Sequence, residues 1–428
     1  MAVRRKQRGI RSKVGAVALV LLSVCLAGAA WAQNLNVLYT FNGGKDGYGP
    51  LGPIVVDSAG NIYGTTQIGG KNNSGTVYRL APSGNGWTKT ILHSFADITS
   101  RKDGYQPLSG LIADAAGNLY GTTWGGGAYI SGTVFELVKT PNTKLGWTEK
   151  IIWSFGALDD YCNCAIAFDS HGNLFGVAQG GAGTWNRGEV FELSRVHGKW
   201  TQTGLYYFNG VPVQGKEYYE YPQGSFPLAA PVVDQDGNVY GTTYQGGISS
   251  TNFMGGTLWE LTPSGGAWNF TLLHTFTGDN DGAGTDAALI LDSSGNIFGT
   301  TLYGSPSEFG DVFEFSPSGG GWTETMLFDF TFGDGGVPIG GVIADAAGNL
   351  YGTAAYGGNG GCPYPGCGIV YELSPSSGGQ YTEKTLHNFT GVEGNTPESG
   401  VVLSNGNLYG ATYAGGFFGA GVIYEISF

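Results

Sequence analysis

Short apolar segments of strand length recur along the chain, and turn residues separate them. In one representative unit, the run Leu108 to Asp114 is followed by the turn 115–118 and by a second run, Leu119 to Thr123. A third run, Gly132 to Leu137, follows a glycine-rich loop, and a fourth covers Trp147 to Phe155. Runs of this length bounded by Gly, Pro, Asn and Asp are typical of β-strands. The unit therefore predicts four strands.

The same unit occurs seven times. Its most regular part is Gly-Asn-Leu-Tyr-Gly-Thr-Thr at 117–123, and the interval between successive Asn residues of this motif is 53 to 65 residues. The other copies begin at Gly60, Gly172, Gly237, Gly295, Gly348 and Gly406. A period of this size indicates a repeat architecture.

Turn chemistry explains the start of the motif. Asp114 can accept hydrogen bonds from the following amides, Gly117 can adopt a positive φ, and Asn118 tolerates the same region. The acid recurs in five other copies, and the last copy has Ser404, which holds such a turn more weakly. These acids are Asp57, Asp169, Asp234, Asp292 and Asp345.

Large rings occupy one fixed position in two of the strands. Such a ring can fill the wedge between neighbouring sheets, so we expect both sets in the core. The second-strand set is Tyr63, Tyr120, Phe175, Tyr240, Phe298, Tyr351 and Tyr409. The third-strand set is Tyr78, Phe135, Phe191, Trp259, Phe313, Tyr371 and Tyr424.

The fourth strand predicts how the repeats close. The seventh repeat stops at Phe428 after its third strand, whereas residues 36–42 at the other end of the chain match the fourth-strand endings, such as Leu92 to Phe95. An N-terminal strand that completes the last sheet closes a circular β-propeller. We therefore predict an all-β, seven-bladed β-propeller of four-stranded blades in one domain, 33–428, in which 34–42 complete the blade formed by 399–428.

The topology also predicts two different faces. The loops between second and third strands and those between blades lie on one face, and the Asp-to-Asn turns lie on the other. The first face has the variable lengths, and its longest excursion is Asn209 to Pro227.

The first 32 residues resemble an export signal. Six basic residues precede an apolar run, Val14 to Ala30, and Ala30-Trp31-Ala32 is a small-x-small cleavage site. A membrane anchor is the alternative, although the run is short for spanning a bilayer. A lipoprotein signal at Cys25 is disfavoured, because Val24 is larger than the residue that normally precedes a lipidated cysteine. We expect a signal peptide, 1–32, and a mature chain without a transmembrane segment that is secreted, either extracellular or in the periplasm or at the cell surface.

Charge excludes some partners. Without the signal, 14 basic residues face 33 acidic ones, a formal charge of −19. Such a field repels phosphate backbones and anionic headgroups, so we expect no nucleic-acid partner.

The composition is rich in glycine, with 78 residues, which fits many strands joined by tight turns. We expect a monomer.

Four cysteines remain after the signal. In an exported protein we expect a disulfide between Cys362 and Cys367, which would close a small loop. The pairing of Cys162 with Cys164 is open because so short a ring is strained. A zinc site made by all four is disfavoured by their spacing and by the lack of a nearby His.

The repeat as a whole resembles a known family. The elements that carry the likeness are Asp103-Gly104-Tyr105, Pro107, Gly110-Leu111-Ile112, Asp114, Gly117 to Thr123, Gly125-Gly126 and Gly132 to Phe135. This pattern resembles the exported bacterial tandem-repeat family nicknamed GloVer, over essentially all of the mature chain. The resemblance implies export and surface or extracellular display, often with a C-terminal sorting signal, and brings no established activity. No sorting tail follows Phe428, which argues against anchoring by that route.

Acidic residues in the loops between blades are one candidate site. Carboxylates beside glycine-rich turns can bind calcium, but each blade holds its acid far from the next, so we favour solvated turns and assign no metal or other cofactor. These interblade acids are Asp46, Asp103, Asp159, Asp160, Glu217, Asp279, Asp281, Asp334 and Glu393.

Three histidines share one position in the fourth strand. His93, His274 and His387 stand where other repeats have Tyr, Trp or Phe. That interchange indicates packing, and separate blades cannot bring the three together at one metal or catalytic site.

Aromatic residues in the variable loops are the preferred binding candidates. Exposed rings with polar neighbours suit stacking on sugars or gripping peptides, whereas packing within the loops is the alternative. They are Trp124, Trp185, Tyr244, Tyr303, Tyr356 and Tyr413.

Two functions remain open. The first is an exported binding or interaction module whose partner is an extracellular glycan or protein. The second is a secreted carbohydrate-active hydrolase or lyase that uses loop carboxylates. We favour binding, because no pair of carboxylates and no nucleophile with its base is singled out, and the catalytic residues stay unknown.

Overall fold

The computed structural model describes residues 34–156, 162, 164–180, 186–212, 219–247, 255–377 and 379–428. The chain divides into two units, Met1–Ala32 and Gln33–Phe428, and only the second contains described residues. The predicted signal peptide therefore lies outside them. No helix in the described ranges is long and apolar enough to cross a membrane.

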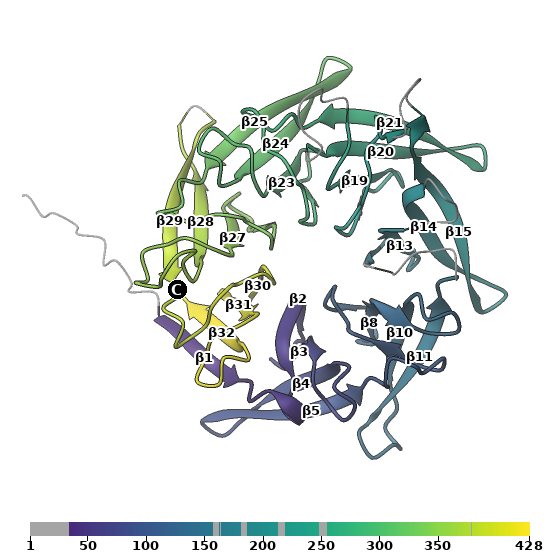
Figure 1. The fold of residues 1–428 in the computed structure, drawn as a ribbon, viewed down its shortest axis with the longest axis vertical. Helices are drawn as coiled ribbons and strands as arrows, with labels where there is room; N and C mark the ends of the chain where they lie inside the picture. The colour runs from purple at the N-terminus through teal and green to yellow at the C-terminus, as the bar shows by residue number, and fades with distance from the viewer. Residues whose placement is uncertain are drawn as a thin grey trace, which may run out of the picture. The chain divides into compact units, whose positions relative to one another are not determined.

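Gln33–Phe428 forms a ring of seven antiparallel sheets around a central channel (Figure 1). Each sheet is a blade of four strands, listed here from the channel outwards. Blade 1 is β2 (Tyr48–Val56), β3 (Ile62–Ile68), β4 (Thr76–Ser83) and β5 (Gly86–Ser94); blade 2 is β7 (Ile112–Ala113), β8 (Leu119–Thr123), β10 (Thr133–Lys139) and β11 (Trp147–Ser154); blade 3 is β12 (Ala165–Phe168), β13 (Leu174–Ala178), β14 (Asn186–Val196) and β15 (Lys199–Asn209). Blade 4 is β18 (Val232–Val233), β19 (Val239–Thr243), β20 (Thr257–Ser264) and β21 (Ala267–Thr275); blade 5 is β22 (Ile290–Leu291), β23 (Ile297–Thr301), β24 (Asp311–Ser318) and β25 (Gly321–Asp329). Blade 6 is β26 (Val342–Ala344), β27 (Leu350–Ala354), β28 (Ile369–Pro375) and β29 (Tyr381–Asn388).

Blade 7 joins the two ends of the ring. It consists of β30 (Val401–Ser404), β31 (Asn407–Thr412), β32 (Val422–Ser427) and, on the outside, β1 (Asn34–Thr40). The register pairs Asn34 with Ser427 and Thr40 with Val422. The seven-bladed fold and its closure by the N-terminal strand are thereby confirmed.

Short elements lie in the loops. They are the 3₁₀ helix η1 (Gly44–Asp46), the pair β6 (Gly104–Tyr105) and β9 (Gly125–Gly126), and the pair β16 (Val211–Pro212) and β17 (Tyr219–Glu220). The last pair lies within the long excursion between blades 3 and 4.

The innermost strand is shorter than the sequence predicted. In blade 2 the expected run from Leu108 is reduced to Ile112–Ala113. Gly110 has φ 74°, and the amide of Leu111 donates to the carbonyl of Pro53 in blade 1 at 3.1 Å. The segment before β7 therefore bonds to its neighbour blade instead of extending the sheet.

The core lies between blades. All third-strand rings are at most 1% exposed, whereas Tyr409 of the second-strand set is only half-buried. Each third-strand ring meets the phenylalanine that ends the fourth strand of the preceding blade; the centroids of Phe95 and Phe135, for example, are 5.3 Å apart. The prediction of a core built from both sets is confirmed for all rings except Tyr409.

The Asp turns contain the predicted hydrogen-bond acceptor, but the conformation of their Asn differs from the prediction. Asp114 accepts hydrogen bonds from the amides of Ala116 at 2.9 Å and Asn118 at 2.8 Å, and Gly117 has φ 76°. Asn118 does not adopt a positive φ. Its side-chain amide instead donates to Asp114 at 2.8 Å. The Asn of the motif therefore holds the turn through its side chain.

Candidate functional site

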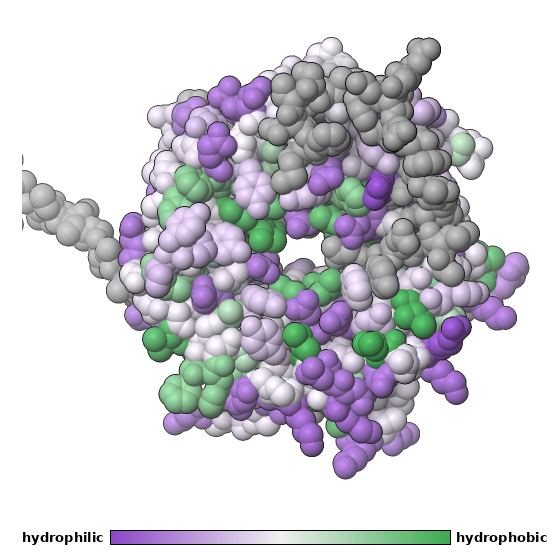
Figure 2. Space-filling model, in the orientation of Figure 1, coloured by the Kyte–Doolittle hydropathy of each residue, from purple (hydrophilic) through white to green (hydrophobic). Residues whose placement is uncertain are grey.

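The central channel holds a cavity with a volume of about 660 Å³. Every blade contributes residues in or just before its innermost strand, for example 51–53 from blade 1, 108–112 from blade 2 and 398–402 from blade 7. Figure 2 shows the opening at the centre of the ring, bordered by hydrophobic patches. A largely apolar cavity with few polar groups is the usual form of a ligand site.

Two carboxylates interrupt this apolar wall. Asp286 of blade 5 and Glu398 of blade 7 line the channel at a repeat position that is leucine or isoleucine in four other blades. Those residues are Leu51, Leu108, Leu228 and Ile339. Both acids were missed in the sequence, although their signal was present: an acid at a position that is apolar in four of the other five blades.

Protein surrounds both carboxylates. Burial raises the pKa of Asp286 to about 7, and the negative charge of Glu398 adds to the effect. Burial also raises the pKa of Glu398. Each side chain keeps some exposed area, because it faces the open channel. No hydrogen bond to either carboxylate occurs between described residues, so both oxygen pairs remain available to a ligand.

Four of the predicted aromatic residues follow the second strands of blades 4 to 7, and three of them, Tyr244, Tyr356 and Tyr413, lie near these acids. Tyr244, Tyr303, Tyr356 and Tyr413 will be called the mouth tyrosines. The rings of Tyr244 and Tyr303 flank Gly284, where an added methyl group would lie 3.2 and 3.5 Å from them. Burial raises the pKa of Tyr244, and Tyr303 and Asp286 raise it further. Blades 4 and 5 therefore place two rings close together, and that of Tyr244 lies near the Asp286 carboxylate.

The other two mouth tyrosines lie beside Glu398. Burial raises the pKa of Tyr356, and the charge of Glu398 and the proximity of Tyr303 add to it. Burial also raises the pKa of Tyr413, and Tyr48 and Glu398 raise it further. Its hydroxyl donates to Oε1 of Gln67, a channel residue, at 3.1 Å. Five neighbouring blades, 4 to 7 and 1, thus supply one continuous polar and aromatic rim.

The remaining two aromatic candidates are not part of this rim as far as the structure describes it. Trp124 of blade 2 packs edge-on against Tyr105, with ring centroids 5.9 Å apart. Trp185 lies outside the described residues.

Contrary to the expectation of solvated turns, five of the six described interblade acids are partly buried. Asp46, Asp103, Asp281, Asp334 and Glu393 are half-buried or loop-facing side chains that fold back on their own loop. Each accepts a hydrogen bond from the amide that follows the fourth strand, as Asp281 does from Thr277 at 3.0 Å. Asp279 alone among the described members is exposed. Asp159, Asp160 and Glu217 lie outside the described residues.

The three histidines pack as predicted and also make a polar contact that the sequence analysis missed. Their rings meet the next phenylalanine edge-on, at 4.8 Å for His93 with Phe95. Nε2 of His93 lies 3.1 Å from Asp103, that of His274 3.1 Å from Asp281, and that of His387 3.3 Å from Glu393. Loop acid and histidine therefore form one unit at three junctions between blades.

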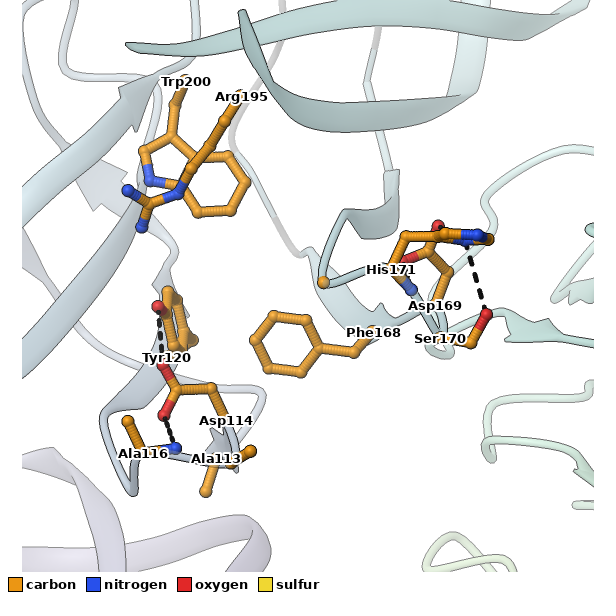
Figure 3. Close-up of a pocket in the computed structure, with 12 residues that line it drawn as sticks. Ala113, Asp114, Ala116, Tyr120, Phe168, Asp169, Ser170, His171, Arg195 and Trp200 are labelled. Carbon is orange, nitrogen blue, oxygen red and sulfur yellow. Dashed lines mark hydrogen bonds and ion pairs between the residues drawn. The ribbon is translucent and has the colours of Figure 1, made fainter. Parts of the chain in front are cut away.

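A second cavity, of about 490 Å³, lies on the opposite face between the Asp turns of blades 2 and 3 (Figure 3). The Arg195 guanidinium lies over the Trp200 ring at 4.5 Å and 3.5 Å from Oε1 of Glu136. Tyr120 donates to Glu136 at 2.6 Å. Because these polar groups are already paired with one another, we assign the ligand site to the channel.

The structure joins Cys362 to Cys367 and Cys162 to Cys164 by disulfides. Cys162 and Cys164 belong to the core between blades 2 and 3, and Cys367 to that between blades 6 and 7. These bonds support the loops that precede β12 and β28.

The fold and the site define the class of protein. It is a seven-bladed propeller whose apolar channel carries two acids and an aromatic rim. The sequence profile described as the Gloeobacter/Verrucomicrobia repeat matches residues 28–247 and 209–424. The chain belongs to that repeat family. A comparison with curated proteins found no match.

Solved structures show the same fold at low sequence identity. One is an extracellular domain from a one-component system of B. thetaiotaomicron, with 11% identity, a TM-score of 0.53 and coverage of 91% of this chain and 40% of that one. Another is PorZ, a surface component of the type-IX secretion system of Porphyromonas gingivalis, with 15% identity, a TM-score of 0.50 and coverage of 91% and 48%. This chain thus spans less than half the length of either. A protein of unknown function from Dyadobacter fermentans has 10% identity, a TM-score of 0.45 and coverage of 92% and 98%.

Proposed function

We propose that this protein is an exported binding module that takes a glycan at the loop end of its channel. The observation that carries the proposal is the convergence of the mouth tyrosines on Asp286 and Glu398. Tyrosine rings offer apolar faces for sugar rings and hydroxyls for hydrogen bonds. Carboxylates in an apolar wall are strong acceptors for sugar hydroxyls or for an amino group.

Charge narrows the class of glycan. The mature chain carries a formal charge of −19, and both channel acids add negative potential at the site itself. Uronate and sulfated chains are therefore repelled. The preferred ligand is therefore an uncharged or amine-bearing saccharide. Its location outside the cell agrees with the expected export signal at 1–32. We expect the protein to bind it as a monomer.

Tyrosine variants test the assignment. Tyr244→Ala and Tyr356→Ala should each weaken binding of neutral saccharides on a glycan array by roughly two- to tenfold, because an aromatic stacking contact is worth about 0.5 to 1.5 kcal/mol. Tyr364→Ala is the matched control, since this tyrosine is 86% exposed and outside the rim. Equal binding by all four proteins would reject the site, and capture of a peptide instead of any saccharide would reject the glycan.

A second candidate is a carbohydrate-active hydrolase or lyase with the channel acids as its pair. It is favoured by one observation: a carboxyl whose pKa is raised to about 7 keeps its proton near neutral pH and can act as a general acid. The interblade acids first considered for this role bond to backbone amides instead. Release of reducing ends from a polysaccharide panel, lost in Asp286→Asn, would establish this activity, and no release would leave binding alone.

A further inference from the structure

Several junctions between blades repeat, within the described residues, one arrangement of three side chains. The first comes from the fourth strand of one blade, the second is an interblade acid, and the third comes from the fourth strand of the next blade. The third residue has an equivalent place in each blade, because it pairs with the same position of the third strand. The pairs are Lys89 with Leu80, Glu149 with Leu137, and Glu324 with Phe315.

The closing junction, between blades 7 and 1, shows that a cation fits this place. The Lys89 ammonium lies 2.9 Å from Oδ1 of Asp46 and also donates to the carbonyl of Asp46. Tyr39 completes the set by donating to the same carboxylate at 2.8 Å. The side chain of Lys89 is only 6% exposed. The fold therefore seats a buried positive charge between a loop acid and two outer strands.

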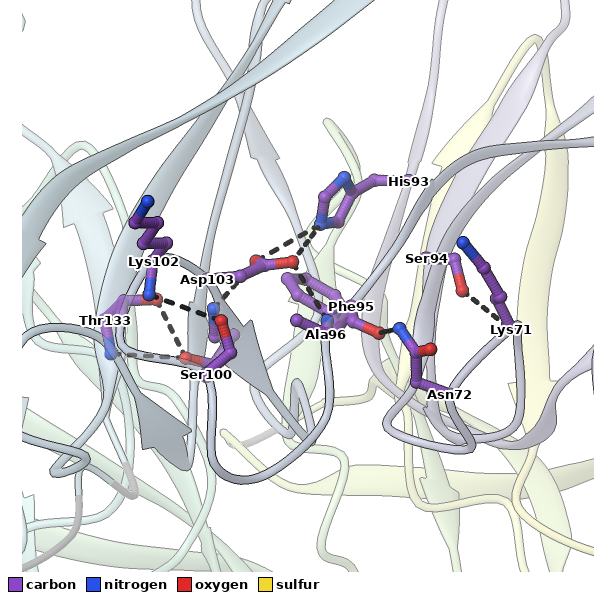
Figure 4. A network of polar contacts seen from close by, with 12 residues as sticks. Lys71, Asn72, His93, Ser94, Phe95, Ala96, Ser100, Lys102, Asp103 and Thr133 are labelled. Atoms are coloured by element: carbon purple, nitrogen blue, oxygen red, sulfur yellow. Dashed lines mark hydrogen bonds and ion pairs between the residues drawn. The ribbon is translucent and has the colours of Figure 1, made fainter.

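Between blades 1 and 2 that lysine is replaced by an acid. His93, Asp103 and Glu149 bring one ligand atom each to within 4.8 Å of one another. Figure 4 shows the His93 ring directed at both Asp103 oxygens, at 3.2 and 3.1 Å, with the amide of Ala96 bonded to the same carboxylate. Oε1 of Glu149 is buried and has no hydrogen-bond partner among the described residues.

The same triad recurs between blades 4 and 5. Nε2 of His274 lies 3.1 Å from Oδ2 of Asp281 and 3.5 Å from Oε2 of Glu324. The three ligand atoms again lie within 4.8 Å of one another. Two junctions thus carry the same His, Asp and Glu at the same positions.

A fourth acid faces the second triad. Asp311 shares a face of β24 with Phe315, whose ring lies 5.1 Å from that of His274. Asp311 is 1% exposed, and within the described residues neither of its carboxylate oxygens has a hydrogen-bond partner. An added methyl group on Gly282, the neighbour of Asp281, would lie 2.6 Å from Oδ2 of Asp311. Three carboxyl groups thus lie close together in a buried place, where a bound cation would offset their charge.

We propose that these two junctions each bind a divalent transition-metal ion, zinc or manganese, through His93, Asp103 and Glu149 and through His274, Asp281 and Glu324. One imidazole with two carboxylates is a ligand set for such ions. Ligand atoms about 2.0 to 2.2 Å from one ion lie roughly 3 to 3.5 Å apart. The separations around His274 have this size. The ion takes the place that the ammonium of Lys89 fills at the closing junction.

Each ion would fasten two blades. Its ligands come from the outer strand of one blade, from the loop that follows it and from the outer strand of the next. Binding only to the folded ring stabilises that ring. This inference is independent of the channel, so either can fail without the other.

Metal content is the test. Untagged protein stripped with a chelator, loaded with Zn²⁺ and dialysed should retain about two ions per chain by mass spectrometry of the metal, and the ions should raise its melting temperature. Glu149→Gln and Glu324→Gln should each reduce retention to about one ion, and the double variant should retain none. Co²⁺ in place of Zn²⁺ should give a ligand-field absorption spectrum that falls by half in each single variant.

The ring supplies its own control. His387→Phe should leave two ions bound, because at that junction Leu35 stands where a third ligand would be. His93→Phe introduces the residue present as Phe328 in blade 5, so the ring should fold while losing one ion. A wild-type chain that retains no ion would overturn the proposal. Retention unchanged in both glutamine variants would also overturn it, since the ions would then lie elsewhere.

Discussion

At the scale of single residues, function in this protein is set by departures from the repeat. Asp286 and Glu398 stand where four of the other five blades place Leu or Ile, and the mouth tyrosines follow the repeated strand where its sequence ceases to agree. The conserved chemistry of the motif does something else: Asp114 and Asn118 hold a turn, and Thr123 pairs with Thr133 at 2.8 Å. The motif builds the ring, and its exceptions build the site.

Asp286 should make stability depend on pH. Its folded pKa of about 7 lies above its ordinary value of 3.8, so the folded state holds a proton that the unfolded state has lost. That stability is complete near pH 4 and is lost as the pH rises to 7. Asp286→Leu removes the buried charge and should stabilise the ring by about 1 to 3 kcal/mol at pH 8, with little effect near pH 4.

Urea unfolding at several pH values would measure this difference. Asp279→Asn is the matched control, since Asp279 is exposed on the same loop and its removal should leave the pH profile unchanged. An effect of Asp286→Leu that is equal at pH 4 and pH 8 would contradict the buried-charge account.

At the scale of elements, each blade packs a large ring over a glycine. The Gly of Gly-Thr-Thr faces the third-strand ring of its own blade, and an added methyl group on Gly121 would lie 2.6 Å from the Phe135 ring and 2.9 Å from the carbonyl of Gly110. The same approach occurs in the other six blades, as between Gly410 and Tyr424. The glycine in this motif is therefore a packing surface.

Gly121→Ala should therefore overpack the core and cost about 1 to 3 kcal/mol in the free energy of unfolding. Denaturant unfolding checks the value. Gly86→Ala in β5 is the comparison, because nothing lies within 4 Å of the added methyl group there, and we expect its effect to be below about 0.5 kcal/mol. Equal costs for the two variants would show that the ring does not require the glycine.

The sequence predicted the blades well because one physical rule is repeated seven times. The Asp turn, the two rings and the phenylalanine after the fourth strand depend on local spacing, and the spacing is regular. The shortening of β7 was not predictable, since it depends on the bond from Leu111 to Pro53 of another blade.

The site was only partly predictable. Four loop aromatics were identified, but their convergence on Asp286 and Glu398 requires the circular order of blades 4 to 7. The contacts of His93 with Asp103 and Glu149 likewise join residues from two blades. Spacing along a single chain does not show which side chains a ring brings together.

At the scale of the whole molecule, the ring is closed by β1. Phe41 is fully buried and its ring lies 5.2 Å from Tyr78 of blade 1, while the strand before it pairs with β32. Lys89 ties the same junction to Asp46. The N-terminal strand therefore holds blade 7 and blade 1 together.

Deletion of residues 34–42 should lower the melting temperature of the entire ring by roughly 5 °C or more and not merely fray one blade, because it removes an outer strand and opens the junction. Circular dichroism during heating measures this. A synthetic peptide of the deleted residues should restore part of the loss. An unchanged melting temperature would refute closure by this strand.

The most direct test of the account is a crystal structure of the mature chain with the saccharide that binds it best on a glycan array. The account predicts that the sugar lies at the loop end of the channel, with rings packed on Tyr244 and Tyr413 and a polar group bonded to Asp286 or Glu398. A sugar bound only in the cavity beside Arg195 and Trp200, or on the outer strands, would contradict it.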